Sequence, residues 1–308
     1  MNRYLLIDGY SVLFRMHCAM PHLSHGGRPT SALKGFWNKL QQWLLPELGK
    51  PTFTHVGLFL DKKDQQGHYR RHKLDPTYKS NRKRADPVMH ESVFSQVPLA
   101  IELCRVLGIK TFIEPGEEAD DLLAGAVDAI NADDAMDDRE SWKEIVSTDK
   151  DLLQLIAEGA RILDLRDNLH WTTTAVFSRY RIHPQHMSLY LALVGDATDG
   201  YVGVKGIGLQ GAREIFEIAN LRAEDPVGSV YANRHLYSGR VQKALKDPMA
   251  LEHSYRLARL YPEAWAYPLT DLQRKPCRSR ELRDFFRSVG FRVDEDVIVG
   301  LSQGELCR

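Results

Sequence analysis

The sequence has 308 residues, of which 43% are hydrophobic and 27% charged, and its 41 basic side chains balance its 41 acidic ones. This is the composition of an ordinary soluble globular chain, long enough for one large domain or two modest ones, and its net charge indicates no class of partner. No stretch approaches a membrane span, and the first apolar run is too short for a signal peptide. The four cysteines lack CxxC spacing, which favours reduced thiols in a cytosol over disulfides or a zinc site.

Buried strands and amphipathic segments alternate from the start of the chain. Residues 4–7 and 55–60 predict strands, and the apolar spacing of residues 30–48 predicts a helix between them. An acid follows each strand, Asp8 after the first and Asp61 after the second. Asp8 alone could simply cap the next helix. The alternation nevertheless predicts an α/β chain with a parallel sheet, in which functional groups collect beyond the carboxyl ends of the strands.

Residues 68–84 form a basic segment, with seven Lys or Arg against one Asp. The ordinary explanation for such a run is a solvated surface helix. The interleaved tyrosines and the excess of Arg favour phosphate binding and stacking on bases instead. If this segment is helical, Lys79 and Arg82 project together because they stand three residues apart.

An acidic stretch over residues 117–121 precedes an apolar helix. Acids in a first turn favour the positive end of the helix dipole, which gives them an ordinary role. Glu118 and Asp121 lie three apart on one helical face, however, and Asp120 lies beside Asp121. Like charges this close repel, so a bound cation is the natural way to hold them together.

Further acids follow the later predicted elements. Asp149 and Asp151 follow a strand, where Asp149 could be only a helix cap, and Asp196 and Asp199 follow a helix. The other predicted elements are a helix over residues 91–107 that Pro98 kinks or divides, strands over 109–113, 143–147 and 160–165, an acidic mobile connection over 133–140, a helical piece over 152–156, and a helix over 184–194.

A glycine-rich turn over residues 203–208 opens a predicted helix over residues 209–219. The turn matches neither GxGxxG nor a Walker loop. Glycines and one Lys ahead of a helix expose backbone N–H groups that suit a phosphate, although a tight helix–helix connection would look the same. Beyond residue 225 the sequence is helical and Arg-rich without a clear motif.

The acids at the predicted strand and helix ends share one chemistry, because all are carboxylates with no His or Cys at comparable positions. They are Asp8, Asp61, Glu118, Asp120, Asp121, Asp149, Asp151, Asp196 and Asp199. All-oxygen ligation favours Mg²⁺ or Mn²⁺ over zinc. These acids are too many for one ion, and two ions suit an in-line displacement at a phosphodiester.

Motifs in order along the chain carry a family resemblance. They are LLIDGY at residues 5–10, DPTYKSNRKR at 75–84, PGEEADD at 115–121, STDKDLLQL at 147–155 and GDATDGYVGVKGIG at 195–208. Together they resemble the 5′-nuclease (flap endonuclease) superfamily, most closely its standalone phage 5′–3′ exonucleases and the 5′-nuclease domain of bacterial DNA polymerase I. The resemblance implies a PIN-like parallel-sheet core over residues 1–183 with a helical arch at about 62–98, then a mostly helical region over 184–308 with a helix–three-turn–helix element at about 190–220.

The resemblance also assigns roles to residues. Asp8, Asp61, Glu118 and Asp120 match a first metal cluster, and Asp121, Asp149, Asp151, Asp196 and Asp199 match a second. Lys79 and Arg82 match the pair that gathers the scissile phosphate, Tyr78 is expected to stack on a base, and Lys83 and Arg84 are expected to bind DNA. Gly203, Lys205, Gly206 and Gly208 match the element that grips the duplex backbone, in some members with a K⁺ ion.

The implied reaction is metal-dependent hydrolysis of DNA near single/double-strand junctions, giving a 5′-phosphate and a 3′-hydroxyl in replication or repair. The expected substrates are 5′ flaps, nicks and free 5′ ends, with RNA primers and RNA/DNA hybrids as further candidates. A monomer in a bacterial or phage-infected cytoplasm is expected. One departure is Thr198-Asp199-Gly200, where many members have Ser-Asp-Asn.

Two alternatives belong to other functional classes. One is a junction-binding protein on the same scaffold with a silent metal site, although every expected acid is present here. The other is a single-strand ribonuclease of the related PIN type, which lacks the long basic arch and the glycine turn that this chain has.

Overall fold

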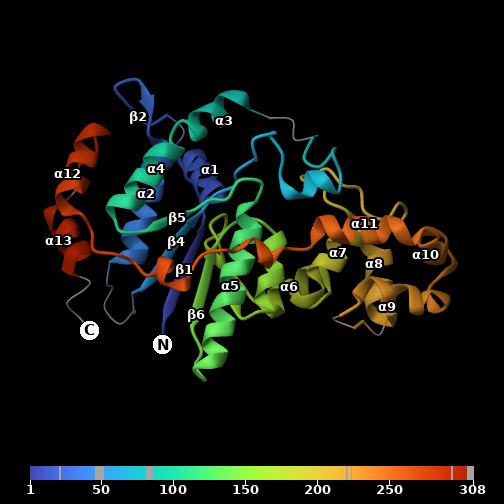
Figure 1. The fold of residues 1–308 in the computed structure, drawn as a ribbon. Helices are drawn as coiled ribbons and strands as arrows, with labels where there is room; N and C mark the ends of the chain where they lie inside the picture. Colours follow the sequence, from blue (N-terminus) through green and yellow to red (C-terminus); the bar gives the residue numbers. More distant parts are fainter. Residues whose placement is uncertain are drawn as a thin grey trace.

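A computed structural model describes residues 1–20, 22–45, 52–80, 86–219, 221–222, 224–292 and 294–303. Its centre is a six-stranded sheet in the order β5-β4-β1-β6-β7-β8 (Figure 1). The strands are β1 (Arg3–Asp8), β4 (His55–Phe59), β5 (Lys110–Phe112), β6 (Trp142–Val146), β7 (Ala160–Asp164) and β8 (Leu169–Trp171), with a separate hairpin of β2 (Ser24–His25) and β3 (Arg28–Pro29). All pairings in the sheet are parallel except that of β8 with β7. The predicted α/β class with a parallel sheet is confirmed.

Each face of the sheet is covered by its own hydrophobic core, because side chains alternate between faces along a strand. From β1, Leu5 and Ile7 point to one face and Tyr4 and Leu6 to the other. The first face packs against α1 (Gly9–Ala19), α2 (Ser31–Leu44), α3 (Pro87–Phe94) and α4 (Val97–Val106), and the second against α5 (Ala119–Met136). Strands buried on both faces explain the continuous apolar runs in the sequence.

Two predicted elements differ clearly from the structure in their bounds. The helix predicted over residues 91–107 is divided into α3 and α4, and Pro98 lies in the first turn of α4, where its missing N–H is not needed. The connection predicted over residues 133–140 begins too early, because α5 continues to Met136. Asp134 stabilises this end of α5 by accepting hydrogen bonds from the Ser141 backbone N–H (2.8 Å) and hydroxyl (2.7 Å).

The basic segment is not a solvated α-helix in its described part. Residues 70–73 form a short 3-10 helix, and Arg71 within it is buried. Lys79 has a φ of 57°, in the left-handed region that an α-helix excludes. Residues 81–85 lie outside the described residues, so the predicted alignment of Arg82 with Lys79, and the complete arch over 62–98, stay predictions.

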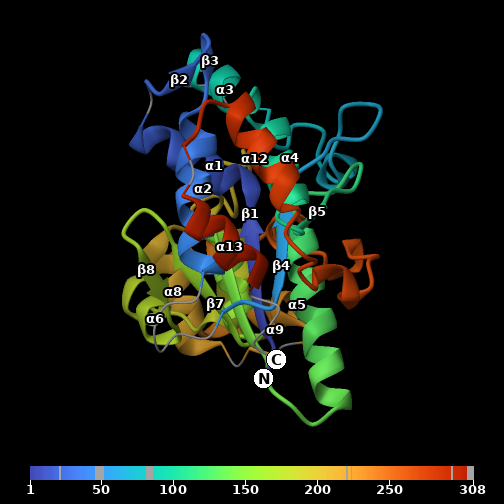
Figure 2. The same cartoon turned by 90° about the vertical axis from the view of Figure 1, so that its left-hand side faces the viewer.

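The chain beyond residue 183 contacts both faces of the sheet. Its helices are α7 (Met187–Val194), α8 (Leu209–Ile218), α9 (Pro226–Ala232), α10 (Gly239–Ala244), α11 (Pro248–Ala258), α12 (Ser279–Ser288) and α13 (Glu295–Gln303), preceded in the chain by α6 (Thr173–Tyr180). The short 3-10 helices are η1 (Arg70–Lys73), η2 (Asp151–Ile156), η3 (Pro184–His186), η4 (Arg234–Leu236), η5 (Pro262–Ala264) and η6 (Leu269–Leu272). Helices α7 to α11 extend from the α5 side, whereas α12 and α13 lie beside α2 and α4 (Figures 1 and 2).

Packing of Phe286 against Trp37, with ring centroids 4.7 Å apart, fastens α12 to the N-terminal part of the chain. The predicted boundary at residue 183 stays a prediction. Among the helices that the structure describes, none has the length and apolar character needed to cross a membrane.

Candidate functional site

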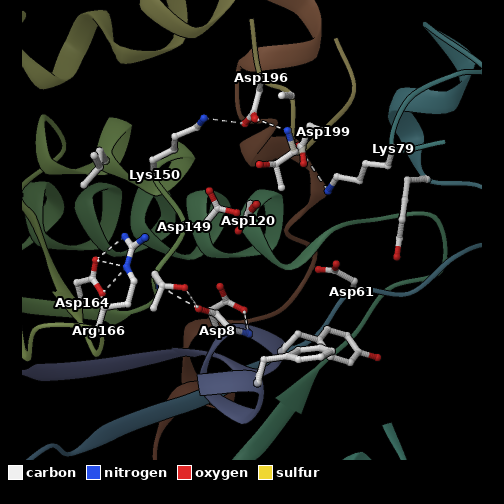
Figure 3. A pocket seen from close by; sticks show the side chains of 18 of the residues that line it. Asp8, Asp61, Lys79, Asp120, Asp149, Lys150, Asp164, Arg166, Asp196 and Asp199 are labelled. Carbon is white, nitrogen blue, oxygen red and sulfur yellow. Dashed lines mark hydrogen bonds and ion pairs between the residues drawn. The ribbon is translucent and has the colours of Figure 1, made fainter. Parts of the chain in front are cut away.

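Acids from separate elements meet at the carboxyl edge of the sheet. Asp8 ends β1, Asp61 follows β4 and Asp149 follows β6, so the parallel arrangement brings them to one edge. They line a cavity of about 1260 Å³ together with Asp120, Asp196 and Asp199 (Figure 3). Acids up to 191 residues apart in the sequence therefore share one cavity, as the strand-end pattern predicted.

Asp8 combines a structural role with a place in the cavity. It caps α1 by accepting a hydrogen bond from the Ser11 backbone N–H (3.2 Å), and its second oxygen accepts one from the Ser147 hydroxyl (2.6 Å). Burial, together with the nearby charges of Asp61 and Asp149, raises the pKa of Asp8 to about 7 against these hydrogen bonds. Capping α1 is therefore compatible with a place in the functional site, because the Asp8 side chain does both.

The centre of the cavity concentrates negative charge. Desolvation and the nearby charges of Asp149 and Asp8 raise the pKa of Asp120 well above its usual range. Desolvation also raises the pKa of Asp149, against a hydrogen bond that its Oδ1 accepts from the Asp151 backbone N–H (2.9 Å). Carboxylates that resist ionisation in this way form a site where a cation is strongly favoured.

A second acidic group lies beside the first. One oxygen each of Asp151, Asp196 and Asp199 falls within 4.8 Å of the others. The buried Oδ1 of Asp151 has no hydrogen-bond partner among the described residues, and desolvation with neighbouring acids raises the pKa of this carboxyl well above its usual range. Lys150 Nζ lies 3.1 Å from Asp196 Oδ2 and supplies part of the compensating charge. An unpaired buried oxygen in an all-oxygen donor set fits Mg²⁺ or Mn²⁺.

The structure does not bring Asp121 into the cavity. Arg71 grips both of its oxygens, with NH1 at 2.6 Å from Oδ2 and NH2 at 2.9 Å from Oδ1, and the Tyr261 backbone N–H donates a further bond (2.9 Å). Arg71 NH1 also lies 2.6 Å from Glu118 Oε2. The sequence predicted that Glu118 and Asp121 share a face and need a cation. In the structure that cation is a buried guanidinium, so the geometry gives no support to Asp121 as a metal ligand.

Lys79 connects this buried network to the cavity. Its Nζ contacts Glu118 Oε1 and lies 3.6 Å from Asp199 Oδ2, while its backbone N–H donates to the Asp199 carbonyl (2.8 Å). The turn at Lys79 thus places the ammonium between Glu118 and Asp199, and Figure 3 shows it beside Asp199 at the cavity wall.

Tyr78 does not have the exposure that base stacking needs. Its side chain is 3% exposed, and its hydroxyl donates to Asp199 Oδ2 at 2.8 Å. The stacking role expected of Tyr78 is therefore replaced by a role in orienting Asp199. Tyr69 lines the cavity beside Lys79, whose Nζ lies 5.7 Å from its ring centroid. Arg82, Lys83 and Arg84 lie outside the described residues.

The glycine turn between α7 and α8 depends on close backbone packing. At Gly203, with φ 69°, an added Cβ would lie 2.4 Å from the backbone nitrogen of Gly195, so only glycine fits. The turn presents Lys205, Gly206 and Gly208 to solvent. The phosphate-binding role expected of this turn ahead of α8 stays a prediction.

Sequence reasoning missed Arg71 and Lys150 as site residues. Lys150 stands between two predicted acids, which was a usable signal. The sequence carried no signal for Arg71. Its burial depends on α11 and the segment that follows, where Arg71 donates to the carbonyls of Leu257 (2.9 Å) and Arg259 (2.8 Å).

A parallel sheet whose carboxyl edge bears this carboxylate cavity defines a PIN-like nuclease fold. Solved structures of this fold include the T5 5′-exonuclease with bound zinc, at TM-score 0.65 and 18% identity over 99% of this chain and 98% of that one. The catalytic core of Rad2 in complex with DNA substrate has TM-score 0.57 and 15% identity, over 97% of this chain and 93% of that one.

Sequence comparisons are more specific. Residues 3–181 match the family model of the 5′-3′ exonuclease N-terminal resolvase-like domain. A 5′-3′ exonuclease of Aquifex aeolicus is 30% identical over 85% of this chain and 83% of its own. DNA polymerase I of Mycobacterium tuberculosis is 31% identical over 80% of this chain, which spans only 26% of that polymerase. The chain belongs to the 5′–3′ exonuclease family of metal-dependent nucleases, as the motifs predicted.

Proposed function

We propose that this nuclease is structure-specific and cuts DNA near junctions of single and double strands, giving a 5′-phosphate and a 3′-hydroxyl. The observation that carries the proposal is the cavity in which Asp8, Asp120 and Asp149 face Asp196 and Asp199, with Lys79 at its wall. A phosphodiester needs both a cation-binding floor and a positive wall, and this cavity supplies the two together.

Two groups of acids would hold the metal ions. Asp8, Asp61, Asp120 and Asp149 form one group, and Asp151, Asp196 and Asp199 the other. Two ions held there, Mg²⁺ or Mn²⁺, would supply Lewis acidity that lowers the pKa of an attacking water and stabilises the leaving 3′-oxygen. Glu118 reaches the site through Lys79, and Asp121 serves through Arg71 to position this network.

Lys79 would bind the scissile phosphate. Its ammonium contacts Glu118 and lies near Asp199. A phosphate entering the cavity would offer this ammonium a stronger charge-assisted hydrogen bond, which Lys79 can make from its position at the cavity wall. We extend this phosphate-binding role to Arg82, and DNA binding to Lys83 and Arg84, on the family motif. The turn over residues 203–208 would bind the duplex backbone through the exposed residues Lys205, Gly206 and Gly208 ahead of α8, with K⁺ as a further proposed ligand there.

We further propose 5′ flaps, nicks and free 5′ ends as substrates, RNA primers and RNA/DNA hybrids as additional ones, and a monomer acting in replication or repair in a bacterial or phage-infected cytoplasm. Similar solved structures include a T5 flap endonuclease in complex with DNA and metal ions and the catalytic core of Rad2 in complex with DNA substrate.

Cleavage of a duplex bearing a labelled 5′ flap tests the proposal, with Mg²⁺, Mn²⁺ or EDTA, beside a blunt duplex and a single strand. We expect metal-dependent cutting close to the junction that is faster than cutting of the single strand. Tight binding to the junction without cutting in either metal would contradict catalysis and favour the junction-binding alternative. Preferential cutting of single-stranded RNA would favour the PIN-type ribonuclease.

A further inference from the structure

The cavity continues past the acids to a second wall that the proposed chemistry does not use. Its side chains come from the end of β7, from β8 and from α6, and they are Asp164, Arg166, Trp171, Arg179 and Tyr180. In Figure 3, Asp164 and Arg166 lie on the opposite side of Asp149 and Asp120 from Lys79. The acids thus lie between two walls that both carry cations.

This second wall is held in place by a buried acid. Asp164 ends β7 as Asp8 ends β1, but both of its oxygens already accept hydrogen bonds. Oδ2 accepts a hydrogen bond from Trp171 Nε1 (3.4 Å) and lies 2.6 Å from Arg166 NH2, and Oδ1 accepts one from the Arg166 backbone N–H (2.8 Å). Asp164 therefore orients an indole and a guanidinium rather than a metal ion.

A second tether fixes the wall relative to the acids. Arg15, on the helix that Asp8 caps, donates from Nε to the Leu165 carbonyl (3.1 Å) and from NH2 to the Arg166 carbonyl (3.2 Å). The backbone that carries Arg166 is thus bound to the same helix as Asp8. A ligand that contacts this wall is held at a constant distance from the reacting phosphate.

The exposed part of the wall combines aromatic rings with a guanidinium. Arg179 is exposed and its guanidinium carbon lies 5.9 Å from the Trp171 ring centroid and 5.8 Å from that of Tyr180. The two rings are 6.3 Å apart with planes inclined by 31°. Aromatic faces beside Arg bind nucleobases with little sequence preference, since every base has a π-face and every nucleotide a phosphate.

We infer that this wall is a nucleotide-binding subsite that holds one unpaired nucleotide of the substrate, on the far side of the scissile phosphate from Lys79. The base stacks against Trp171 and Tyr180, and Arg179 and Arg166 contact the adjoining phosphate. The nucleotide must be unpaired, because neighbouring bases cover the π-faces inside a duplex. This inference rests on the proposed function and adds a requirement for a splayed base to it.

Single-turnover cleavage of a set of 5′-flap duplexes tests the subsite, each duplex carrying one abasic nucleotide at a successive position across the junction. For the unsubstituted protein we expect one position at which loss of the base slows cleavage about tenfold, the usual scale of base–aromatic stacking. Trp171→Ala should slow cleavage of the intact flap by a similar factor and show no further loss at that position.

The matched control is Phe177→Ala, which removes another exposed aromatic ring from α6; Phe177 is 42% exposed and is not among the described side chains lining the cavity. Phe177→Ala should leave the dependence of the cleavage rate on the position of the abasic nucleotide unchanged. Trp171→Phe should also keep this dependence, because an aromatic ring remains at the position. Arg179→Ala, at an exposed position, should give a several-fold loss with a weaker salt dependence. An abasic penalty that is the same in Trp171→Ala as in the unsubstituted protein would overturn the subsite.

Failure of the proposed function is a separate outcome. If the unsubstituted protein cuts no substrate, quenching of tryptophan fluorescence by single-stranded oligothymidylate in EDTA still decides the subsite. We expect quenching that Trp171→Phe largely removes. Equal fractional quenching in both proteins would overturn the subsite.

Discussion

Two acidic regions meet at the start of α5, and they solve charge repulsion in opposite ways. Glu118 and Asp121 are closed around Arg71 through ion pairs and hydrogen bonds, with each of these side chains at most 4% exposed. In the neighbouring region, Asp151 Oδ1 has no hydrogen-bond partner among the described residues. After desolvation, like charges are the main further cause that raises the pKa of Asp120 and Asp151, whereas in the closed region Arg71 opposes the raised pKa of Asp121. The acids around Arg71 therefore stabilise the fold, whereas the acids of the second region remain available to bind a cation.

The largest expected effect follows from removing an acid of the cavity. Asp120→Ala or Asp149→Ala should reduce cleavage by about 10³-fold or more, because each withdraws an oxygen from the cation-binding floor. The free energy of unfolding in EDTA should not fall, since like-charge repulsion is relieved. Flap cleavage and urea denaturation measure the two quantities. Unchanged turnover in either variant would remove that residue from the site.

Lys79 bridges the two regions, so its loss tests whether they act together. Lys79→Ala should slow single-turnover cleavage by about 10²-fold or more while leaving much of the DNA affinity, because its charge acts on the scissile phosphate. Lys73→Ala is the control, an exposed cation in the same segment that does not line the described cavity. Equal rates for the two variants would contradict the role given to Lys79.

Arg71 tests the closed region directly. Arg71→Met should destabilise the protein by about 3–5 kcal/mol, because two buried carboxylates lose their partner. The adjacent Arg70 pairs with Glu117 at 2.6 Å but is partly exposed, so Arg70→Met should lower the free energy of unfolding by about 1 kcal/mol or less. Urea midpoints of the two variants give the comparison. A similar loss in both would show that burial does not distinguish the pairs.

The open region predicts a stability that depends on pH and metal. The pKa of Asp8 is raised in the fold to about 7, whereas an unfolded Asp titrates near ~4. This group therefore favours the fold below about pH 4, and that contribution is lost as the pH rises to about 7. In EDTA the protein should become less stable over this interval, by on the order of a few kcal/mol for the acids together.

Mg²⁺ should reverse this loss, so the rise in melting temperature on adding Mg²⁺ should be larger at pH 8 than at pH 5. Thermal denaturation with and without EDTA measures it. Asp149→Asn provides the matched variant, in which the difference between the two pH values should shrink. The same metal-induced shift at both pH values would contradict an acidic cavity that competes for protons.

The contrast between the regions also marks the limit of sequence reasoning. Strand-end acids could be predicted because parallel strands share a carboxyl edge, so Asp8, Asp61 and Asp149 meet whatever lies between them. The fate of Asp121 could not, because its partner Arg71 is buried only when the backbone after α11 closes over it. A charge run predicts exposure, and only the tertiary structure shows which member of the run is buried.

The second wall of the cavity was missed for a related reason. β8 is three residues long and pairs antiparallel at the edge of the sheet, so its period-two signal is too short to detect. Asp164 ends β7, whereas the predicted strand over residues 160–165 placed it inside the strand, and its partners Arg166 and Trp171 follow in the next turn and edge strand. Local sequence thus predicted where acids gather, while hydrogen bonding decides which of them remain available.

The smallest effect is expected at the glycine turn, whose Lys205 is exposed and does not line the described cavity. Lys205→Ala should weaken duplex affinity by about tenfold or less and reduce the slope of log K against log salt by about 1, because one phosphate contact and its counterion release are lost. The cleavage rate of saturated substrate should stay unchanged, since Lys205 is exposed and does not line the described cavity. Lys275→Ala, another exposed cation, serves as the control and should keep both affinity and slope. Equal affinity and slope in the Lys205 variant would restrict the turn to a structural connection between α7 and α8, and would leave the cavity walls as the proposed DNA contacts.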